Sequence, residues 1–156
     1  MMLEGKTIIV TGGASGIGRA TCVLAAREGA DIAIADINRE MAEETADMVK
    51  AEGKQALVIE MDTSKKADVL RMVDKTVKAF GTIDGLVCSA IKLVPGKLEE
   101  LPEEDWDMVM DIGLKGYFLC AQAAARAMLA DGQGGVIVNM ASESGLAAFP
   151  VTAAYG

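Results

Sequence analysis

The sequence predicts an α/β fold in which helices cover both faces of a parallel sheet. Five short apolar runs are rich in β-branched residues and lack polar alternation, as is typical of strands buried on both faces. Helical periodicity fills the intervals, and glycines follow several of these helices just before the next strand. The predicted strands are residues 7–10, 32–35, 57–60, 83–88 and 136–140. This repeat is the βαβ pattern of a doubly wound, three-layer sheet, and 156 residues suffice for one such domain.

Two of the intervening helices are predicted from their caps and apolar faces. Asn38 precedes the first and Ser64 the second, and such short polar side chains accept hydrogen bonds from the free N–H groups of a first turn. Spacings of three and four residues place apolar side chains on one helix face. The residues expected to face inward are Met41, Thr45, Met48 and Val49 in the first helix and Val69, Val73, Val77 and Phe80 in the second.

Glycines mark where the helices end. Gly29, Gly53 and Gly81 each follow a helical pattern, where a left-handed residue closes the last turn at no steric cost to glycine. Right-handed crossovers between the strands then restrict the topology. We expect the strand order 3-2-1-4-5, with a ligand crevice between strands 1 and 4, where the order reverses.

The region from residue 101 to residue 132 predicts two further helices. Pro102 starts the first, with Glu103, Glu104 and Asp105 favourable in its first turn. The second, about residues 114–129, is apolar on several faces, which predicts that it is buried or contacts a partner. The residues of the first helix expected to face inward are Trp106, Val109 and Met110.

Composition excludes several classes of function. The net charge of −8 argues against binding to nucleic acid or to an anionic membrane surface. No run is apolar enough to span a membrane and the start of the chain does not resemble a signal peptide, so we expect a cytoplasmic location. The chain has no histidine, which removes Ser-His and Cys-His catalysis. Cys22, Cys88 and Cys120 are widely spaced, which predicts three reduced, buried thiols and no metal site.

A glycine-rich turn carries the first chemical signal. Gly12, Gly16 and Gly18 follow the first predicted strand directly and open the first helix. In a Rossmann-type sheet the first permits a tight turn, the second lets the backbone approach a pyrophosphate, and the third lets helix and strand pack closely. The helix N-terminus offers free N–H groups to a phosphate. A glycine-rich turn with no ligand is the alternative interpretation.

Asp36 strengthens the nucleotide-binding interpretation. It ends the second strand, eighteen residues after Gly18, where a carboxylate accepts hydrogen bonds from the adenosine ribose hydroxyls. That carboxylate would repel a 2′-phosphate, so we expect NAD in preference to NADP, although nearby Arg39 leaves NADP open. Asp36 could instead cap the next helix, but Asn38 suits that role better.

The combination resembles the short-chain dehydrogenase/reductase family. Residues 11–18 are similar to its TGxxxGIG fingerprint, and Asp62 resembles its adenine-contacting aspartate. Ser142, after the fifth strand, resembles the catalytic serine, and Tyr155, thirteen residues later, resembles the catalytic tyrosine. The matches run in order from Lys6 to Gly156, so the resemblance covers essentially the whole chain as a single NAD-binding domain.

The resemblance implies an oxidoreductase that moves a hydride between NAD(H) and an alcohol or carbonyl substrate. Tyr155 would be the acid/base, and Ser142 would hydrogen-bond the substrate oxygen. The cofactor-binding residues that it implies are Gly12, Ser15, Gly16, Ile17, Gly18, Asp36, Asp62, Thr63 and Ala90. Taken singly, Ser142 could be an ordinary turn residue and Tyr155 an apolar contact. Their joint spacing favours the catalytic interpretation.

Three departures from the family pattern favour an alternative, a non-catalytic NAD-binding module. The Asn-Asn-Ala-Gly of the family appears as Cys88-Ser89-Ala90-Ile91, so only the alanine matches. Gly113 stands where the family has an asparagine that anchors a water of the proton relay. The family lysine four residues after the tyrosine would fall beyond Gly156.

A chain that stops at Gly156 would have little or no turnover, because the lysine cation lowers the pKa of the tyrosine in the family. It would also leave the fifth strand and the 114–129 helix uncovered, which predicts a homo-oligomer.

Overall fold

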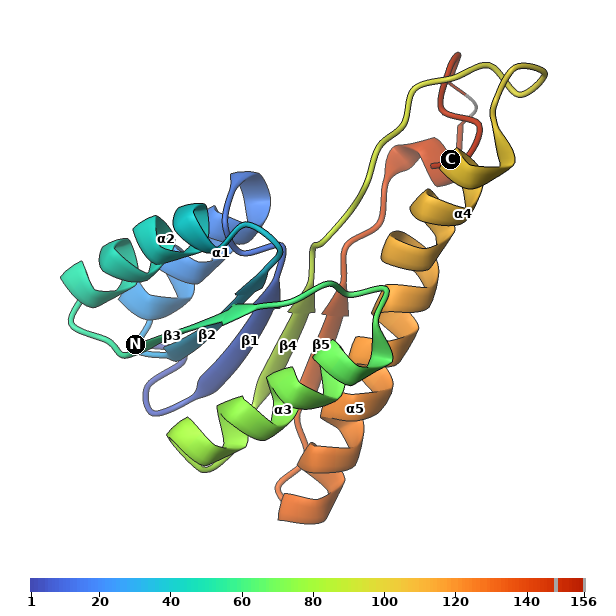
Figure 1. Ribbon diagram of the computed structural model, residues 1–156. Coiled ribbons are helices and arrows are strands. Elements are labelled where there is room, and N and C mark those ends of the chain that lie inside the picture. Colours follow the sequence, from blue (N-terminus) through green and yellow to red (C-terminus); the bar gives the residue numbers. More distant parts are fainter. Residues whose placement is uncertain (148, 156) are drawn as a thin grey trace.

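The fold is a five-stranded parallel sheet, as predicted. The computed structural model describes residues 1–147 and 149–155, so Gly156 lies outside the described residues. The sheet has the order β3-β2-β1-β4-β5 (Figure 1), which confirms the predicted topology. Its strands are β1 (Thr7–Thr11), β2 (Asp31–Asp36), β3 (Ala56–Glu60), β4 (Gly85–Cys88) and β5 (Val136–Asn139).

The strand register brings the carboxyl ends of the central strands together. Thr11 at the end of β1 pairs with Ala35 of β2 on one side and with Cys88 of β4 on the other. Cys88 in turn pairs with Asn139 at the end of β5. The loops that follow these strands therefore leave the sheet at one edge, where parallel doubly wound sheets bind ligands.

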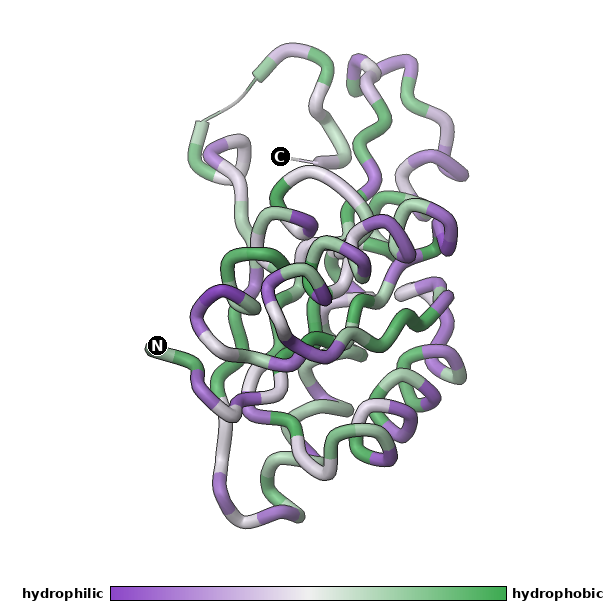
Figure 2. Tube along the Cα trace, turned by 90° about the vertical axis from the view of Figure 1, so that its left-hand side faces the viewer, coloured by the Kyte–Doolittle hydropathy of each residue, from purple (hydrophilic) through white to green (hydrophobic). Residues whose placement is uncertain are grey.

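Helices lie on both faces of the sheet (Figure 1). Helices α1 (Gly16–Arg27) and α2 (Arg39–Ala51) pack on one face over β1, β2 and β3. Helices α3 (Lys66–Phe80) and α5 (Gly116–Asp131) pack on the other, where they contact strands from β2 to β5. Two buried apolar clusters, one on each face, form the core. Hydrophilic and hydrophobic segments alternate along the helices (Figure 2), as expected when one side faces the sheet.

The sheet-facing side of α2 and α3 differs in part from the prediction. Met48 is 43% exposed and Val77 37% exposed, although both were expected to face inward. The prediction from periodicity gave weight to large apolar side chains. In α2, however, small alanines face the sheet and let the helix approach it closely. In α3, Thr76 can be buried because its hydroxyl donates a hydrogen bond to the Met72 carbonyl. The buried residues are Ala42, Thr45, Ala46 and Val49 in α2 and Val69, Met72 and Thr76 in α3, while Met41, Val73 and Phe80 are half-buried.

The predicted helix ends are confirmed except at Ser64. The Asn38 side chain accepts a hydrogen bond from the Met41 N–H at 3.1 Å and caps α2. Ser64 does not cap α3, because its hydroxyl donates to the Asp62 carboxylate at 2.7 Å and the helix begins after Lys65. The glycines that were expected to end helices adopt positive φ values, which are +102° at Gly29, +80° at Gly53 and +88° at Gly81.

The two helices predicted between residues 101 and 132 form one uninterrupted helical segment. Pro102 precedes α4 (Glu103–Met110), which continues through a π-helical turn (Asp111–Lys115) into α5. The π turn lies where the first predicted helix was expected to end and the second to begin, and it joins them without a break. Helix α4 extends beyond the sheet edge (Figure 1), so only Val109 of its expected inner face is buried; Met110 is half-buried and Trp106 is 40% exposed.

Apolar side chains remain exposed on β5 and α5 in the described part of the chain. Val136 and Val138 are 65% and 45% exposed and line a groove with Ile8. On α5, Phe118 is 59% exposed and Leu129 77% exposed, as expected for a helix that is apolar on several faces. No helix among the described residues is long and apolar enough to cross a membrane.

Candidate functional site

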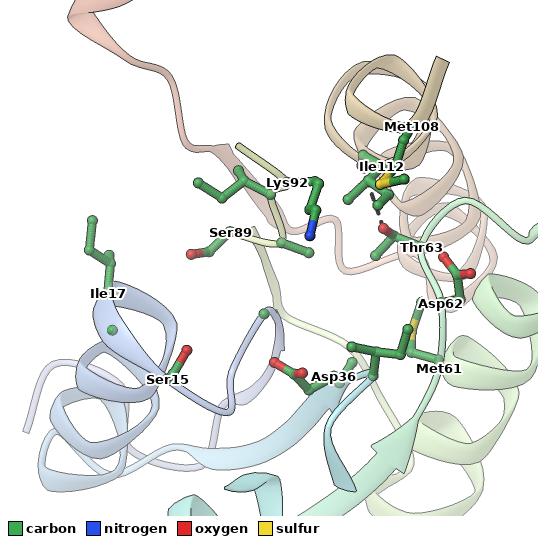
Figure 3. A pocket seen from close by; sticks show the side chains of 16 residues that line it. Ser15, Ile17, Asp36, Met61, Asp62, Thr63, Ser89, Lys92, Met108 and Ile112 are labelled. Carbon is green, nitrogen blue, oxygen red and sulfur yellow. Dashed lines mark hydrogen bonds between the residues drawn. The ribbon is translucent and has the colours of Figure 1, made fainter. Parts of the chain in front are cut away.

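A cavity of about 590 Å³ lies at the carboxyl edge of the sheet, where a ligand crevice was predicted (Figure 3). Residues that follow β1, β2, β3 and β4 form most of its wall, and α4 and the π turn close one side. The lining residues are Gly12, Ser15, Gly16, Ile17, Ala35, Asp36, Ile37, Met61, Asp62, Thr63, Ser89, Ala90, Ile91, Lys92, Met108 and Ile112.

The glycine-rich turn is built so that side chains would obstruct it. Gly12 has φ +69°, and a Cβ there would lie 2.8 Å from the nitrogen and Cα of Ala90. A Cβ on Gly18 would collide with the Gly12 carbonyl oxygen, so Gly18 lies beneath the cavity and not in its wall. Gly16 has φ +52° and open space around it, so its backbone is accessible to a ligand.

The N-terminus of α1 faces this cavity without an internal cap. Ser15 is the N-cap residue, but its side chain makes no capping hydrogen bond, and the first turn carries no acidic residue. The N–H groups of the first turn therefore lack the partner that an N-cap side chain normally supplies. Such a helix end attracts an anion, and a phosphate fits it well.

Asp36 holds the turn in place from the end of β2. One carboxylate oxygen accepts a hydrogen bond from the Ala14 N–H at 3.0 Å, and the other accepts from the Asn38 N–H at 2.9 Å. The Arg19 guanidinium donates to the Ala14 carbonyl at 2.8 Å and fixes the same turn from the helix side. Each carboxylate oxygen has a further lone pair for a hydroxyl donor in the cavity. Since Asn38 caps α2, Asp36 does not have that role.

Asp62 and Thr63 form the wall that follows β3. The Asp62 carboxylate accepts hydrogen bonds from the Ser64 N–H and hydroxyl and lies 3.4 Å from the Lys65 ammonium. Burial opposes the charge of Asp62, but the Ser64 hydrogen bonds and the Lys65 cation outweigh burial and lower its pKa. Thr63 is buried and donates from its hydroxyl to the Ile112 carbonyl at 3.5 Å, which joins this wall to the π turn.

The loop after β4 keeps its backbone position despite its unusual side chains. Ser89 N–H lies 3.2 Å from both the carbonyl and the hydroxyl oxygen of Thr11, and the Ala90 N–H reaches the same hydroxyl at 3.5 Å. These bonds hold Ala90 against Gly12. Cys88 lies beneath the loop in the core near Cys120, whose pKa is raised by this contact and by burial. All three cysteines are free and buried, as predicted.

The π turn carries an open glycine, Gly113, and α5 begins with a crowded one, Gly116. A Cβ on Gly116 would lie 3.0 Å from the Thr63 side chain, so a larger residue would push the helix from the cavity wall. A Cβ on Gly113 would meet nothing within 4 Å. Gly113, which stands in place of the family asparagine, therefore has room for a side chain.

Ser142 and Tyr155 lie outside the cavity wall. Ser142 begins a short 3₁₀ helix (Glu143–Gly145) after β5, and its hydroxyl accepts a hydrogen bond from the Ser144 N–H at 3.2 Å. Tyr155 is half-buried in a turn that its N–H closes onto the Thr152 carbonyl at 3.0 Å. Burial raises the pKa of Tyr117 on α5 to about 12, with smaller effects of Cys88, Tyr155 and Cys120.

Several lining residues were not predicted. Ile37 and Met61 directly follow β2 and β3, and Ile91 lies three residues after β4, so position at the sheet edge was a usable signal. Met108 and Ile112 come from the continuous helical segment, whose approach to the cavity depends on the π turn and has no sequence signature. Lys92 carries the one amine among the described lining residues, and its side chain points into the cavity (Figure 3).

Comparison with known proteins identifies the family. Residues 6–156 match the short chain dehydrogenase family. The chain is a member of that family. It is 42% identical over 145 residues to a sorbitol dehydrogenase of Cereibacter sphaeroides, covering 93% of this chain and 56% of the relative. It is 41% identical over 155 residues to an uncharacterized oxidoreductase of Thermotoga maritima, covering 99% of this chain and 61% of the relative.

Solved structures of this family share the fold. An NAD⁺-bound xylitol dehydrogenase superimposes with a TM-score of 0.95 at 34% identity, covering 100% of this chain and 60% of that protein. Carveol dehydrogenase from Mycobacterium avium in complex with NAD gives a TM-score of 0.94 at 30% identity, covering 99% and 60%. The chain thus spans about 60% of the length of the short-chain dehydrogenases that it matches.

Proposed function

We propose that this protein is an NAD-dependent oxidoreductase that interconverts an alcohol and a carbonyl compound. The observation that carries the proposal is the position of Asp36. Its carboxylate is hydrogen-bonded to the glycine-rich turn and lines the same cavity as the uncapped end of α1. An anion site next to a ribose-binding carboxylate suits a dinucleotide.

The described residues fit the cofactor. The glycine-rich turn leaves space that a Cβ would fill. The N–H groups in the first turn of α1 have no side-chain cap, so they are available to a phosphate. Asp36 would accept from the adenosine ribose hydroxyls and repel a 2′-phosphate, which favours NAD over NADP. When bound, the nicotinamide supplies or accepts the hydride. The residues proposed to hold the cofactor are Gly12, Ser15, Gly16, Ile17, Gly18, Asp36, Asp62, Thr63 and Ala90.

We assign the acid/base role to Tyr155 and the substrate-oxygen hydrogen bond to Ser142. A free tyrosine has a pKa near 10, so about one molecule in a thousand is ionised at neutral pH. A neighbouring cation favours the phenolate, and in this family a lysine four residues after the tyrosine supplies it. For the 156-residue polypeptide alone, we expect turnover to be lower than in the whole protein by roughly two to three orders of magnitude.

A non-catalytic NAD-binding module is the second candidate. Gly113, which stands where the family has a water-anchoring asparagine, favours it. The whole protein should be assayed for NADH formation with a panel of sugar alcohols, cyclic diols and simple alcohols, beside its Tyr155→Phe variant. Turnover that Tyr155→Phe abolishes supports the oxidoreductase. NAD binding without turnover on any substrate supports the module.

We also propose that the protein self-associates in the cytoplasm. The exposed apolar residues on α5, Phe118 and Leu129 among them, support association. The three free thiols suit a reducing compartment. Light scattering of the purified protein over a dilution series tests the association, and a monomer at every concentration would contradict it.

A further inference from the structure

The loop after β4 places a lysine at the cofactor cavity. Lys92 follows Ala90 by two residues and lines the cavity. Its side chain points inward, and its ammonium lies over the space between the glycine-rich turn and the wall formed by Thr63 (Figure 3). The side chain is reached by solvent, so it is free to adjust to a ligand.

The backbone that carries Lys92 is fixed relative to the glycine-rich turn. Thr11 binds the N–H groups of Ser89 and Ala90, and Ala90 lies against Gly12 so closely that no side chain fits between them. The register of β1 with β4 sets this contact, because Thr11 and Cys88 are paired. Lys92 lies two residues beyond this fixed point, on the cavity wall that faces Ser15 and Ile17 across the cavity (Figure 3).

The charge of the cavity leaves a role for this cation. Among the described lining residues, Asp36 and Asp62 are carboxylates and Lys92 is the one basic side chain. Asp62 has Lys65 as its ion-pair partner, whereas Lys92 has no carboxylate within 4.0 Å in the described part of the chain. A pyrophosphate carries two negative charges, and a cation beside it would favour its binding to a protein with a net charge of −8.

We propose that Lys92 is a cofactor-binding residue whose ammonium contacts the pyrophosphate held by the N-terminus of α1. The proposal rests on the proposed dinucleotide-binding function, which it deepens by naming a second source of positive charge. The helix end supplies N–H groups from one side, and Lys92 supplies a mobile cation from the other. Lys92 should therefore contribute to the affinity for ligands that carry the pyrophosphate and not to the affinity for adenosine alone.

Binding of two probes separates these parts of the cofactor. The dissociation constants of ADP-ribose and adenosine are measured by NMR titration for the wild-type protein, Lys92→Met and Lys92→Arg. Lys97→Met is the matched control, because Lys97 is exposed, pairs with Glu100 and lies outside the cavity. We expect Lys92→Met to weaken ADP-ribose binding by about 3- to 10-fold and Lys92→Arg to restore most of it. Adenosine binding should change by less than about twofold, and added salt should weaken ADP-ribose binding less in Lys92→Met than in wild type.

Each other outcome overturns the proposal in a recognisable way. Unchanged ADP-ribose binding in Lys92→Met would mean that the ammonium is only solvated. If Lys92→Met weakens the binding of ADP-ribose and of adenosine equally, Lys92 acts on the adenosine part of the ligand or on the fold and not on the pyrophosphate. If the wild-type protein binds neither probe, the proposed dinucleotide-binding function fails and this inference fails with it.

Discussion

The backbone of Ala90 lies against Gly12, so that a Cβ on Gly12 would come within 2.8 Å of the Ala90 nitrogen and Cα. This contact joins the turn after β1 to the loop after β4 across the point where the strand order reverses. It explains why a cavity forms there, since the two loops are held together at their base and diverge above it. It also makes Gly12 sensitive to substitution for two separable reasons, its positive φ and its neighbour.

Substitution of Gly12 by alanine should therefore cost more than positive φ alone explains. Gly53 is the control, because it also has positive φ, +80°, but a Cβ there meets nothing within 4 Å. We expect Gly53→Ala to lower the free energy of unfolding by about 1–2 kcal/mol. Gly12→Ala should lower it by about 1–3 kcal/mol more, because the two loops must separate. Urea denaturation measures both, and equal losses would show that the Ala90 contact carries no energy.

The Asp36 carboxylate should set the choice between NAD and NADP. In Asp36→Asn the amide keeps the shape of the side chain but loses the negative charge. That charge strengthens the hydrogen bonds that the carboxylate accepts from ribose hydroxyls, and it repels a 2′-phosphate. We expect NAD to bind about 10-fold more weakly and NADP to bind more tightly than in wild type, as judged by calorimetric titration of both cofactors. Asp47→Asn is the control, since Asp47 is an exposed residue of α2 that pairs with Lys50. Equal weakening of both cofactors would mean that Asp36 acts only by holding Ala14.

The lowered pKa of Asp62 predicts an acid-dependent loss of stability. The pKa of Asp62 is below its usual 3.8 in the folded protein, so the folded state binds the proton less readily than the unfolded state. The resulting stabilisation is present above about pH 4 and is lost as the pH falls through the folded-state pKa. We expect the free energy of unfolding of Ser64→Ala to fall less steeply below about pH 4 than that of wild type, because the substitution removes the hydroxyl hydrogen bond to Asp62, while the bond from the backbone N–H of residue 64 stays.

A series of denaturation curves between about pH 2 and pH 7 tests this dependence. Asp74→Asn is a control, because Asp74 pairs with Lys78 on the exposed side of α3 and should leave the wild-type pH profile nearly unchanged. A Ser64→Ala profile parallel to that of wild type would exclude the Ser64 hydroxyl as a cause of the lowered pKa.

The features that the sequence predicted correctly are those set by local physics. Buried parallel strands need continuous apolar runs, and turns such as that at Gly29 need positive φ, so both leave a pattern in neighbouring residues. The inner face of α2 was only partly predicted, because Ala42 and Ala46 contact the sheet by virtue of their small size. The cavity wall formed by Met108 depends on where a π turn carries the helix, which is a tertiary property.

Gly113 offers a direct comparison of the two proposed functions. A side chain fits at this position, since a Cβ meets nothing within 4 Å, and asparagine has a slightly higher helix propensity than glycine. Gly113→Asn should therefore change the free energy of unfolding by less than about 0.5 kcal/mol. Gly116→Ala is the contrasting variant three residues later, and its contact with Thr63 should cost about 1–3 kcal/mol.

The effect of Gly113→Asn on turnover then separates an oxidoreductase from a binding module. If the protein is an oxidoreductase whose proton relay lacks one anchor, the new amide should raise the kcat of the whole protein by roughly 10-fold or more. The affinity for NAD should stay the same, because Gly113 is not among the residues that line the cavity. Steady-state NADH formation and NAD titration on the same preparations provide the two values. If wild type and variant both bind NAD and neither turns over any alcohol, the missing asparagine is not the limiting defect and the protein is a binding module.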